Sequence, residues 1–261
     1  MHEALEALRY QGYAIIEGAV PANLLERTRD ALYRGQAGIE AQLGTERLQR
    51  AGERGVVRIP FLFDDVFYEY LTLSSVLEVV DAVIGNTAIL HLMNGFVLPS
   101  VAPAEPAIFQ TTFHPDFPRY LNGYMASVNA FVAIDAFTPE NGATLVVAGT
   151  QQRASAPDAA YMRAHAVPAC ASAGSLLVFD STLWHAAGQN RSGKDRLALN
   201  MQFTKSFFKQ QIDYVRAIGS SKILALPERS QQLLGWYTRV VTSLDEYYRP
   251  ESERLYRRGQ G

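Results

Sequence analysis

The chain has 261 residues, 48% of them hydrophobic, which is enough to bury a sizeable core. Its 24 basic and 26 acidic residues give a formal net charge of -2 without a strongly charged run, which argues against nucleic-acid-binding and membrane-surface proteins. The single cysteine, Cys170, allows no intrachain disulfide, and we predict that it is a small buried residue of a cytoplasmic protein.

The N-terminal third, about residues 1–86, is predicted to be mainly helical. Tyr13–Gly18 has the character of a short strand that ends at a turn. A helix is expected from Ala22 onward, because apolar residues recur there at helical spacing. Residues 36–58 are polar and contain glycine, which predicts a loop with some helix. A second helix is predicted over Ser74–Ile84, with a serine at its start as the N-cap.

The middle of the chain, about residues 87–205, favours strands. Turn signals separate short runs that are rich in β-branched and aromatic residues: 87–92, 96–98, 107–113, 126–136, 144–148, 175–180 and 196–203. Such punctuation predicts a jelly roll, and the aromatic and charged segment 206–261 predicts helices packed on it. The predicted fold class is therefore α+β, mainly β: a double-stranded β-helix core, cupin-like and flanked by helices, in one domain over residues 1–261.

Two histidines and one carboxylate form the strongest chemical pattern in the sequence. His114-Pro115-Asp116 places a histidine and a carboxylate two residues apart, so on an extended segment both side chains share a face. A second histidine, His185, follows 71 residues later at the end of an apolar run. Two histidines and a carboxylate on one side of a metal leave open positions, as in non-haem iron(II) oxygenases. We therefore predict that His114, Asp116 and His185 are metal ligands and catalytic residues.

Arg196 follows His185 by 11 residues, across a turn-rich connection. A hairpin there would place Arg196 on the strand adjacent to His185. Alternation then gives residues 196, 198, 200 and 202 one face of this strand and the apolar residues between them the other face. An inward arginine near a metal is suited to the distal carboxylate of a keto-diacid, because its planar fork matches a carboxylate bidentately.

Together these motifs resemble the phytanoyl-CoA dioxygenase family of iron(II)- and 2-oxoglutarate-dependent oxygenases. The resemblance covers roughly residues 5–205 and rests on segments spread along the chain: Leu8–Gly18, His114–Asp116, 133–150, 174–193 and Arg196. It implies iron(II), 2-oxoglutarate and O2 as cofactor and cosubstrates. It also implies oxidation of a small-molecule substrate, most often hydroxylation in specialised metabolism, with release of succinate and CO2.

The chain departs from the family pattern around the cosubstrate. Ala187 and Ala198 stand where the family often has small polar residues, so other side chains must supply those hydrogen bonds. The candidates for cosubstrate binding beside Arg196 are Asn129, Gln110, Thr112 and Asn94, together with Phe131 at a position where the family often has tryptophan. Arg119 could meet an anionic group of the substrate.

Several alternatives remain open at this point. The same cofactors support desaturation, epimerisation or ring closure, whereas Asp116 disfavours halogenation, which in relatives uses a vacated carboxylate position. A cupin-like metal enzyme that does not use 2-oxoglutarate is a second possibility, and a non-catalytic jelly-roll binding protein is a third. Arg196 argues against a metal enzyme that does not use 2-oxoglutarate, and the complete ligand set argues against a non-catalytic binding protein. The sequence identifies neither the substrate nor the oligomeric state.

Overall fold

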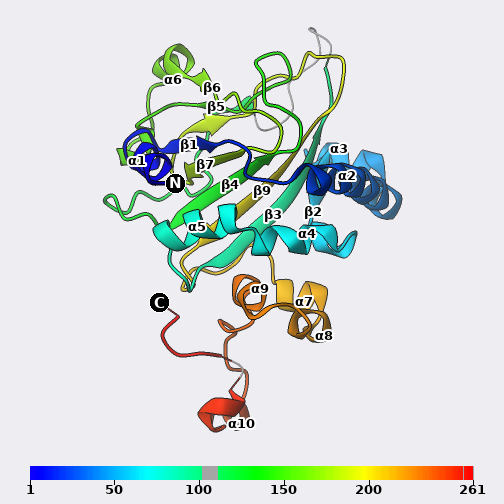
Figure 1. The fold of residues 1–261 in the computed structure, drawn as a ribbon, viewed down its shortest axis with the longest axis vertical. Coiled ribbons are helices and arrows are strands. Elements are labelled where there is room, and N and C mark those ends of the chain that lie inside the picture. Colours follow the sequence, from blue (N-terminus) through cyan, green and yellow to red (C-terminus); the bar gives the residue numbers. More distant parts are fainter. Residues whose placement is uncertain (102–110, 255, 261) are drawn as a thin grey trace.

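The computed structural model describes residues 1–101, 111–254 and 256–260. Helices dominate both ends of the chain and strands its middle (Figure 1). The helices are α1 (His2–Gln11), α2 (Ala22–Leu43), α3 (Thr45–Arg50), α4 (Val66–Glu69), α5 (Ser74–Val83), α6 (Ala159–His165), α7 (Tyr214–Ile218), α8 (Ser220–Leu224), α9 (Glu228–Leu233) and α10 (Leu244–Tyr247). The strands are β1 (Tyr13–Ile16), β2 (Val56–Arg58), β3 (Ile89–Leu98), β4 (Ser127–Ala133), β5 (Leu145–Val146), β6 (Val167–Pro168), β7 (Leu176–Asp180), β8 (His185–Ala186) and β9 (Arg196–Thr204).

Two antiparallel sheets form the β part of the molecule. The larger sheet has six strands in the order β1-β7-β4-β9-β3-β2, and the smaller has three in the order β6-β5-β8. β9 lies at the centre of the larger sheet, where it pairs with β3 from Leu98↔Arg196 to Ile89↔Thr204 and with β4 on its other side. The strands β4, β7 and β9 thus each have a neighbouring strand on both edges, whereas β8 is an edge strand of the smaller sheet.

Alternate residues of β9 enter two different apolar cores. Leu197, Leu199, Met201 and Phe203 are fully buried in a cluster shared with helical residues such as Leu32 of α2. Ala198 belongs to a second cluster, with Phe131 of β4 and Phe179 of β7. The predicted alternation along this strand is therefore confirmed. One face of the larger sheet packs on helices, and the other faces the smaller sheet.

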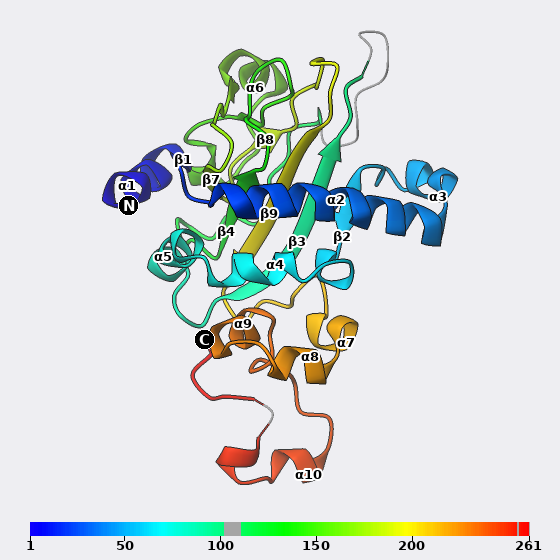
Figure 2. The ribbon, with the colours of Figure 1, turned by 45° about the vertical axis from the view of Figure 1, so that its right-hand side comes forward.

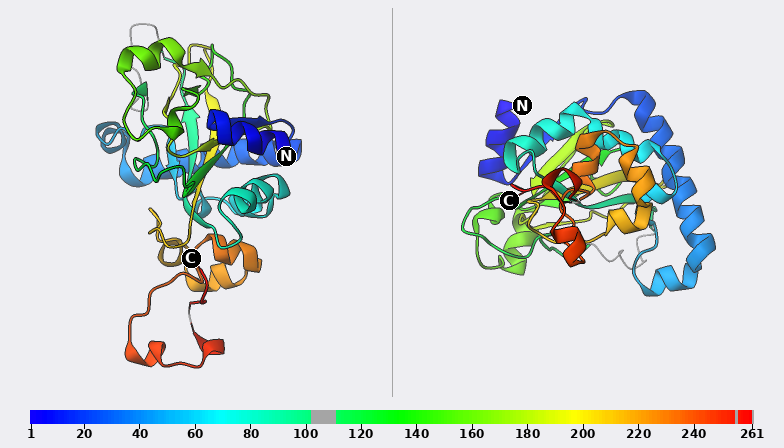
Figure 3. Two further views of the ribbon diagram at one scale, coloured as in Figure 1. Left: turned by 90° about the vertical axis from the view of Figure 1, so that its left-hand side faces the viewer. Right: turned by 90° about the horizontal axis from the view of Figure 1, so that it is seen from below.

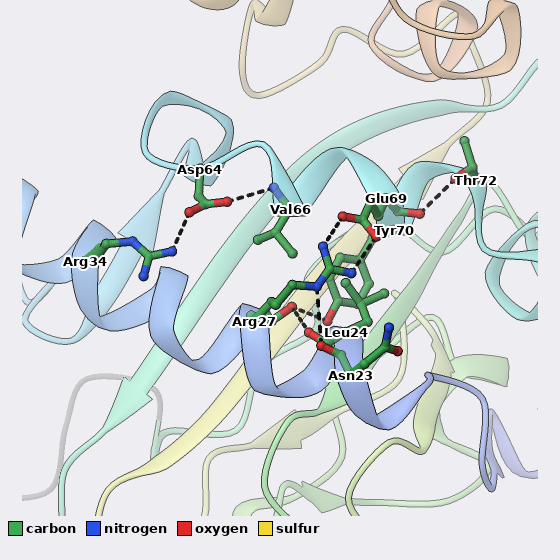
Figure 4. A network of polar contacts seen from close by, with 10 residues as sticks. Asn23, Leu24, Arg27, Arg34, Asp64, Val66, Glu69, Tyr70 and Thr72 are labelled. Atoms are coloured by element: carbon green, nitrogen blue, oxygen red, sulfur yellow. Dashed lines mark hydrogen bonds and ion pairs between the residues drawn. The ribbon is translucent and has the colours of Figure 1, made fainter.

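The helices α2, α4 and α5 cover the outer face of the larger sheet (Figures 1 and 2). Ion pairs link α2 to α4 and the segment before it: Arg27 binds both carboxylate oxygens of Glu69, at 2.5 and 2.8 Å, and Arg34 binds Asp64 at 2.5 Å (Figure 4). Beneath them Thr28 and Tyr70 share a buried hydrogen bond of 2.7 Å. Since the ion pairs are largely exposed, apolar burial contributes more to this packing than they do.

The C-terminal segment packs against one end of the larger sheet, below it in Figure 1, and Figure 3 shows it from two further sides. Tyr214 of α7 is fully buried there and accepts a hydrogen bond of 2.8 Å from the backbone N–H of Met93 in β3. Burial raises the pKa of Tyr214 far above its usual value, so the hydroxyl stays neutral. This bond joins the segment after β9 to the sheet.

Tyr214→Phe should lower the free energy of unfolding by about 1–3 kcal/mol, because it leaves the buried Met93 N–H without a partner. Tyr248→Phe is the matched control, since Tyr248 is 77% exposed. Urea unfolding followed by circular dichroism measures both variants. Equal stability of Tyr214→Phe and the wild type would contradict the anchoring role of this bond.

The structure corrects several sequence predictions. The segment 36–58, predicted as a loop with some helix, contains the end of α2, the helix α3 and the strand β2, which was not predicted. The helix α5 begins without a side-chain cap, because the Ser75 hydroxyl bonds Ala19 instead. The two runs predicted over 87–98 form the single strand β3. In the run 107–113, residues 107–110 lie outside the described part and 111–113 are not a strand. Cys170 is exposed, because it follows the exposed strand β6 in a turn.

Within the described residues, we find no helix that is both long and apolar enough to cross a membrane.

Candidate metal centre

His114, Asp116 and His185 meet between the two sheets. His185 begins β8 of the smaller sheet, opposite Val146 of β5. His114 lies on the other side of His185, and the two residues exchange backbone hydrogen bonds, N–H of His114 to the His185 carbonyl at 2.9 Å and the reverse at 3.1 Å. Asp116 follows two residues later. The predicted dyad and the distant histidine are therefore brought together by strand pairing rather than by chance contact.

The ligand atoms of the three side chains converge. Oδ1 of Asp116 lies 3.7 Å from Nε2 of His114 and 3.8 Å from Nε2 of His185. All three ligand atoms lie within 4.8 Å of one another, so together they could hold one metal ion. His185 is 7% exposed, whereas Asp116 and His114 are only half-buried. The site thus has a closed side at β8 and an accessible side toward the cavity.

Backbone carbonyls fix the orientation of both imidazoles. Nδ1 of His114 lies 2.8 Å from the Thr112 carbonyl oxygen, and Nδ1 of His185 lies 2.9 Å from that of Leu183. A carbonyl only accepts, so each Nδ1 must carry its proton and each Nε2 presents a lone pair toward Asp116. Burial lowers the pKa of His185, with the charge of Asp116 opposing this, which favours the neutral imidazole that a metal needs.

A buried chain of polar side chains ends on Asp116. Nδ2 of Asn129 donates to Oδ2 of Asp116 at 2.9 Å and to Oδ1 of Asn200 at 3.0 Å. The Oδ1 atom of Asn129 accepts from Ser181 at 2.5 Å, and Ser181 in turn accepts from Ser127 at 2.7 Å. With Oδ2 engaged by Asn129, Oδ1 of Asp116 is the oxygen that faces both histidines. The chain therefore orients the carboxylate for a single-oxygen contact.

Arg196 is a buried cation with unused donors. Its side chain is 4% exposed, and among the described residues Nε and Nη1 have no hydrogen-bond partner. The ring of Phe137 lies 4.7 Å from the guanidinium carbon and that of Phe131 lies 6.0 Å away. Burial lowers the pKa of Arg196 to about 10, so the group remains charged at neutral pH. Such an arrangement fits an anion that is bidentate and planar.

One cavity contains both the three ligand residues and Arg196. It has about 730 Å³ of unfilled space, part of it open to solvent. Its wall includes Phe131, Asn200 and Ala187, and an exposed arginine, Arg54. The donor set suits iron(II), and the unpartnered guanidinium suits the far carboxylate of a keto-diacid held at the metal. The residues present therefore fit the cofactor and the cosubstrate that the sequence predicted.

The comparison with protein families agrees with this geometry. A family model described as phytanoyl-CoA dioxygenase (PhyH) matches residues 8–198, which include His114, Asp116, His185 and Arg196. The chain belongs to the phytanoyl-CoA dioxygenase family. It is thus an enzyme of the non-haem iron and 2-oxoglutarate dioxygenase type, as the sequence predicted.

Similar sequences and structures extend this family assignment. An uncharacterised protein of Mycobacterium tuberculosis is 57% identical over 262 residues, which cover 100% of this chain and 96% of the relative. The dioxygenase olcK of Penicillium canescens is 34% identical over 119 residues, 42% of this chain and 36% of the fungal protein. The non-heme monooxygenase ThoJ, in a nickel complex, has a TM-score of 0.59 at 19% identity, covering 80% of this chain and 79% of its own. The alpha-ketoglutarate-dependent epimerase SnoN from nogalamycin biosynthesis has a TM-score of 0.57 at 17% identity, covering 78% and 81%.

The two solved structures show the fold that this family member shares. Mixed α and β elements with antiparallel sheets are consistent with a cupin-like oxygenase fold. The structure nevertheless corrects one step of the sequence argument. Arg196 is not on a strand adjacent to His185: β8 pairs with β5, whereas β9 pairs with β3 and β4. The connection between them crosses from the smaller sheet to the larger, and both side chains line the same cavity.

The other residues predicted to bind the cosubstrate have different surroundings. Phe131 lines the cavity. Asn129 holds Asp116, and the Thr112 side chain is exposed while its carbonyl orients His114. Asn94 lies opposite Asn200 in the register of β3 and β9. Gln110 lies outside the described residues.

Sequence reasoning missed Ser181 and Arg54. It placed Asn200 on the same face of the strand as Arg196 but gave it no role in the site. Ser181 follows β7 directly, and no local pattern distinguishes it from a turn residue. Arg54 falls in a segment that was predicted to be a loop. Arg119, by contrast, is exposed and bonds the Pro118 carbonyl, and the wall of the metal cavity does not include it.

Proposed function

We propose that this chain binds iron(II) through His114, Asp116 and His185 and uses 2-oxoglutarate and O2 to oxidise a small-molecule substrate, most often by hydroxylation. Succinate and CO2 are the co-products. One observation carries the proposal: the buried guanidinium of Arg196, whose Nε and Nη1 have no partner among the described residues, shares a cavity with the three ligand residues. A site that only holds a structural metal does not need a buried arginine, whereas binding the far carboxylate of a keto-diacid does.

Each side chain contributes a separate part of the mechanism. The iron, when bound, supplies the oxidising chemistry that amino-acid side chains lack. His114 and His185 present neutral Nε2 atoms because backbone carbonyls hold their Nδ1 protons. Asn129 keeps one oxygen of Asp116 occupied and turns the other toward the histidines. Arg196 orients the cosubstrate by its far carboxylate and leaves the keto acid directed toward the metal.

The apolar wall excludes water from the reaction. Phe131 and Phe179 line the cavity beside the ligand residues, and Phe179 lies 4.8 Å from the His185 ring between centroids. A water-poor surrounding strengthens the electrostatic contacts of Arg196 and protects reactive species from solvent. The proposal also includes the fold predicted from the sequence, a double-stranded β-helix in a single domain, and the two antiparallel sheets are consistent with it.

Other reactions with the same cofactors are desaturation, epimerisation and ring closure. The fold likeness to SnoN, an alpha-ketoglutarate-dependent epimerase, favours epimerisation as the second candidate. A metal enzyme that does not use 2-oxoglutarate gives no role to Arg196. A cytoplasmic location and a small-molecule partner without nucleic acid or membrane remain part of the proposal.

Metal and succinate measurements test the proposal directly. Wild-type protein should bind about one iron(II) per chain and release succinate from 2-oxoglutarate, fastest with its substrate in a candidate panel. His114→Ala should lose most metal affinity, and Asp116→Ala should lose succinate release by a factor of about 10² or more, because each removes a ligand. His165→Ala, an exposed histidine of α6, is the control. Iron uptake that survives His114→Ala, or the absence of 2-oxoglutarate turnover across the panel, would reject it.

A further inference from the structure

Arg54 is a second cation in the wall of the metal cavity. The charged or titratable side chains that line this cavity are Arg54, His114, Asp116, His185 and Arg196. Four of them belong to the metal centre or to the cosubstrate position. Arg54 is exposed, and no ion pair or hydrogen bond occupies its guanidinium among the described residues. Of the charged groups that the described residues contribute to the cavity wall, it is therefore the one that the proposed function does not use.

The backbone presents Arg54 at a fixed place. The Val56 N–H bonds the Glu53 carbonyl at 3.0 Å, which closes a turn with Arg54 and Gly55 at its centre. Gly55 has φ +79°, as the third residue of a type II turn requires, and a Cβ there would lie 2.4 Å from the Val97 carbonyl oxygen. Only glycine therefore fits at this position.

Two further contacts hold the turn against the cavity. The Val97 N–H donates to the Gly55 carbonyl at 2.8 Å, which attaches the turn to β3. Glu53 binds Arg58 of β2 through both carboxylate oxygens, at 2.6 and 2.9 Å, so the acidic neighbour of Arg54 is already neutralised. The turn is thus part of the sheet, and within residues 1–101, 111–254 and 256–260 the Arg54 charge has no intramolecular partner that would compete with a ligand.

With a metal ion and 2-oxoglutarate in place, the net charge of the cavity would be balanced by one further negative charge. A divalent metal and two arginines against one carboxylate leave an excess of positive charge, and a 2-oxoglutarate dianion cancels all of it except a single charge. That remaining charge corresponds to Arg54. The rest of the wall near Arg54 is apolar, with Val56, Phe96, Val97 and Leu98. A ligand that complements this surface combines one acidic group with an apolar body.

We propose that Arg54 binds an acidic group of the substrate, so that the substrate class is an organic anion, a carboxylate or a phosphate ester, with an apolar body. This assignment rests on the proposed function, because it takes the metal and 2-oxoglutarate to fill the inner cavity. Arg54 pairs with the anion near the exposed side, and the apolar part of the substrate lies along β3 toward the metal.

Matched probes of different charge test the assignment without catalysis. Protein loaded with zinc(II) and saturating 2-oxoglutarate is titrated calorimetrically with phenylacetate, 4-phenylbutyrate and phenyl phosphate, and with the corresponding neutral amides. Wild type should bind the anions about three- to tenfold more tightly than the amides, less so at high salt. Arg54→Gln should bring this ratio close to one, and Arg54→Lys should retain part of it. Arg50→Gln, an exposed arginine of α3, should behave as wild type.

The outcomes separate this assignment from the proposed function. Binding of 2-oxoglutarate should be unchanged in Arg54→Gln, because Arg196 supplies that contact. Failure of wild type to bind 2-oxoglutarate would reject the proposed function, whatever the probes do. An anion preference that survives Arg54→Gln, or no anion preference in wild type for any probe pair, would reject the role of Arg54. A preference for phenyl phosphate over the carboxylates, or the reverse, identifies the acidic group.

Discussion

Arg196→Met should weaken 2-oxoglutarate binding by about 2–5 kcal/mol, from about 30-fold to several thousand-fold in KM. The reason is that this guanidinium is buried, lines the same cavity as the two histidines, and has Nε and Nη1 atoms without a hydrogen-bond partner in the described part of the chain. Methionine keeps the apolar stem between Phe131 and Phe137 but removes the charge. Arg196→Lys should lose most of the binding as well, because an ammonium cannot form the bidentate contact.

The stability of the same variant provides an independent readout. In the free protein the Arg196 charge is buried, and none of the described residues is a hydrogen-bonded counter-ion to it. This burial costs folding free energy, as the lowered pKa of about 10 also indicates. Arg196→Met without ligand should therefore unfold at the same temperature as wild type or higher. Addition of 2-oxoglutarate should raise the melting temperature of metal-loaded wild type but not of the variant. A variant that is still stabilised by 2-oxoglutarate would contradict the role of Arg196.

Asn129→Leu should reduce metal affinity by about 10- to 100-fold, although Asn129 has no contact with the metal in the proposed mechanism. Its amide donates to Asp116 and to Asn200, so leucine of similar size releases the carboxylate and allows it to rotate. The variant should also unfold more easily by about 1–3 kcal/mol, because Ser181 loses its acceptor in a buried position. Competition with a chromogenic chelator measures the metal dissociation constant.

Ser127→Ala is the matched control for Asn129. Ser127 belongs to the same chain of hydrogen bonds, where it donates to Ser181 and accepts from Gln202, but it lies two links farther from Asp116. It should lose a similar amount of stability while metal affinity stays within about threefold of wild type. Equal losses of metal affinity in both variants would mean that the chain acts only through stability.

The chemistry of the site was largely predictable from the sequence, because it depends on local rules. Spacing of two residues put His114 and Asp116 on one side of an extended segment, and the alternation of residues along β9 separated the face that carries Arg196 from the apolar face. The strand content of the middle segment and the helices at both ends follow from composition and turn signals. These features need no knowledge of which strands are neighbours.

The remaining features depend on tertiary pairing, which the sequence does not specify locally. A turn-rich connection after His185 reads equally well as a hairpin or as a crossing between sheets, and the structure has the crossing. Residues 36–43 continue α2 because buried Ile39 belongs to the face that packs on the larger core. Asn129 could be assigned to the cavity but not to Asp116, because that contact joins two segments 13 residues apart.

The alternation along β9 has a consequence for how such a protein can change. The larger apolar core contains four residues of this strand, Leu197, Leu199, Met201 and Phe203. The cavity is lined by Arg196 and Asn200, which lie on the opposite face of the same strand. Residues that stabilise the fold thus alternate along one strand with residues that line the cavity. A deletion or insertion of one residue would turn the core residues toward the cavity and the cavity residues toward the core. Substitution can adjust either property separately, but a change in length destroys both at once. New substrate ranges are therefore more accessible through segments at the rim, such as the turn that carries Arg54, than through the central strand.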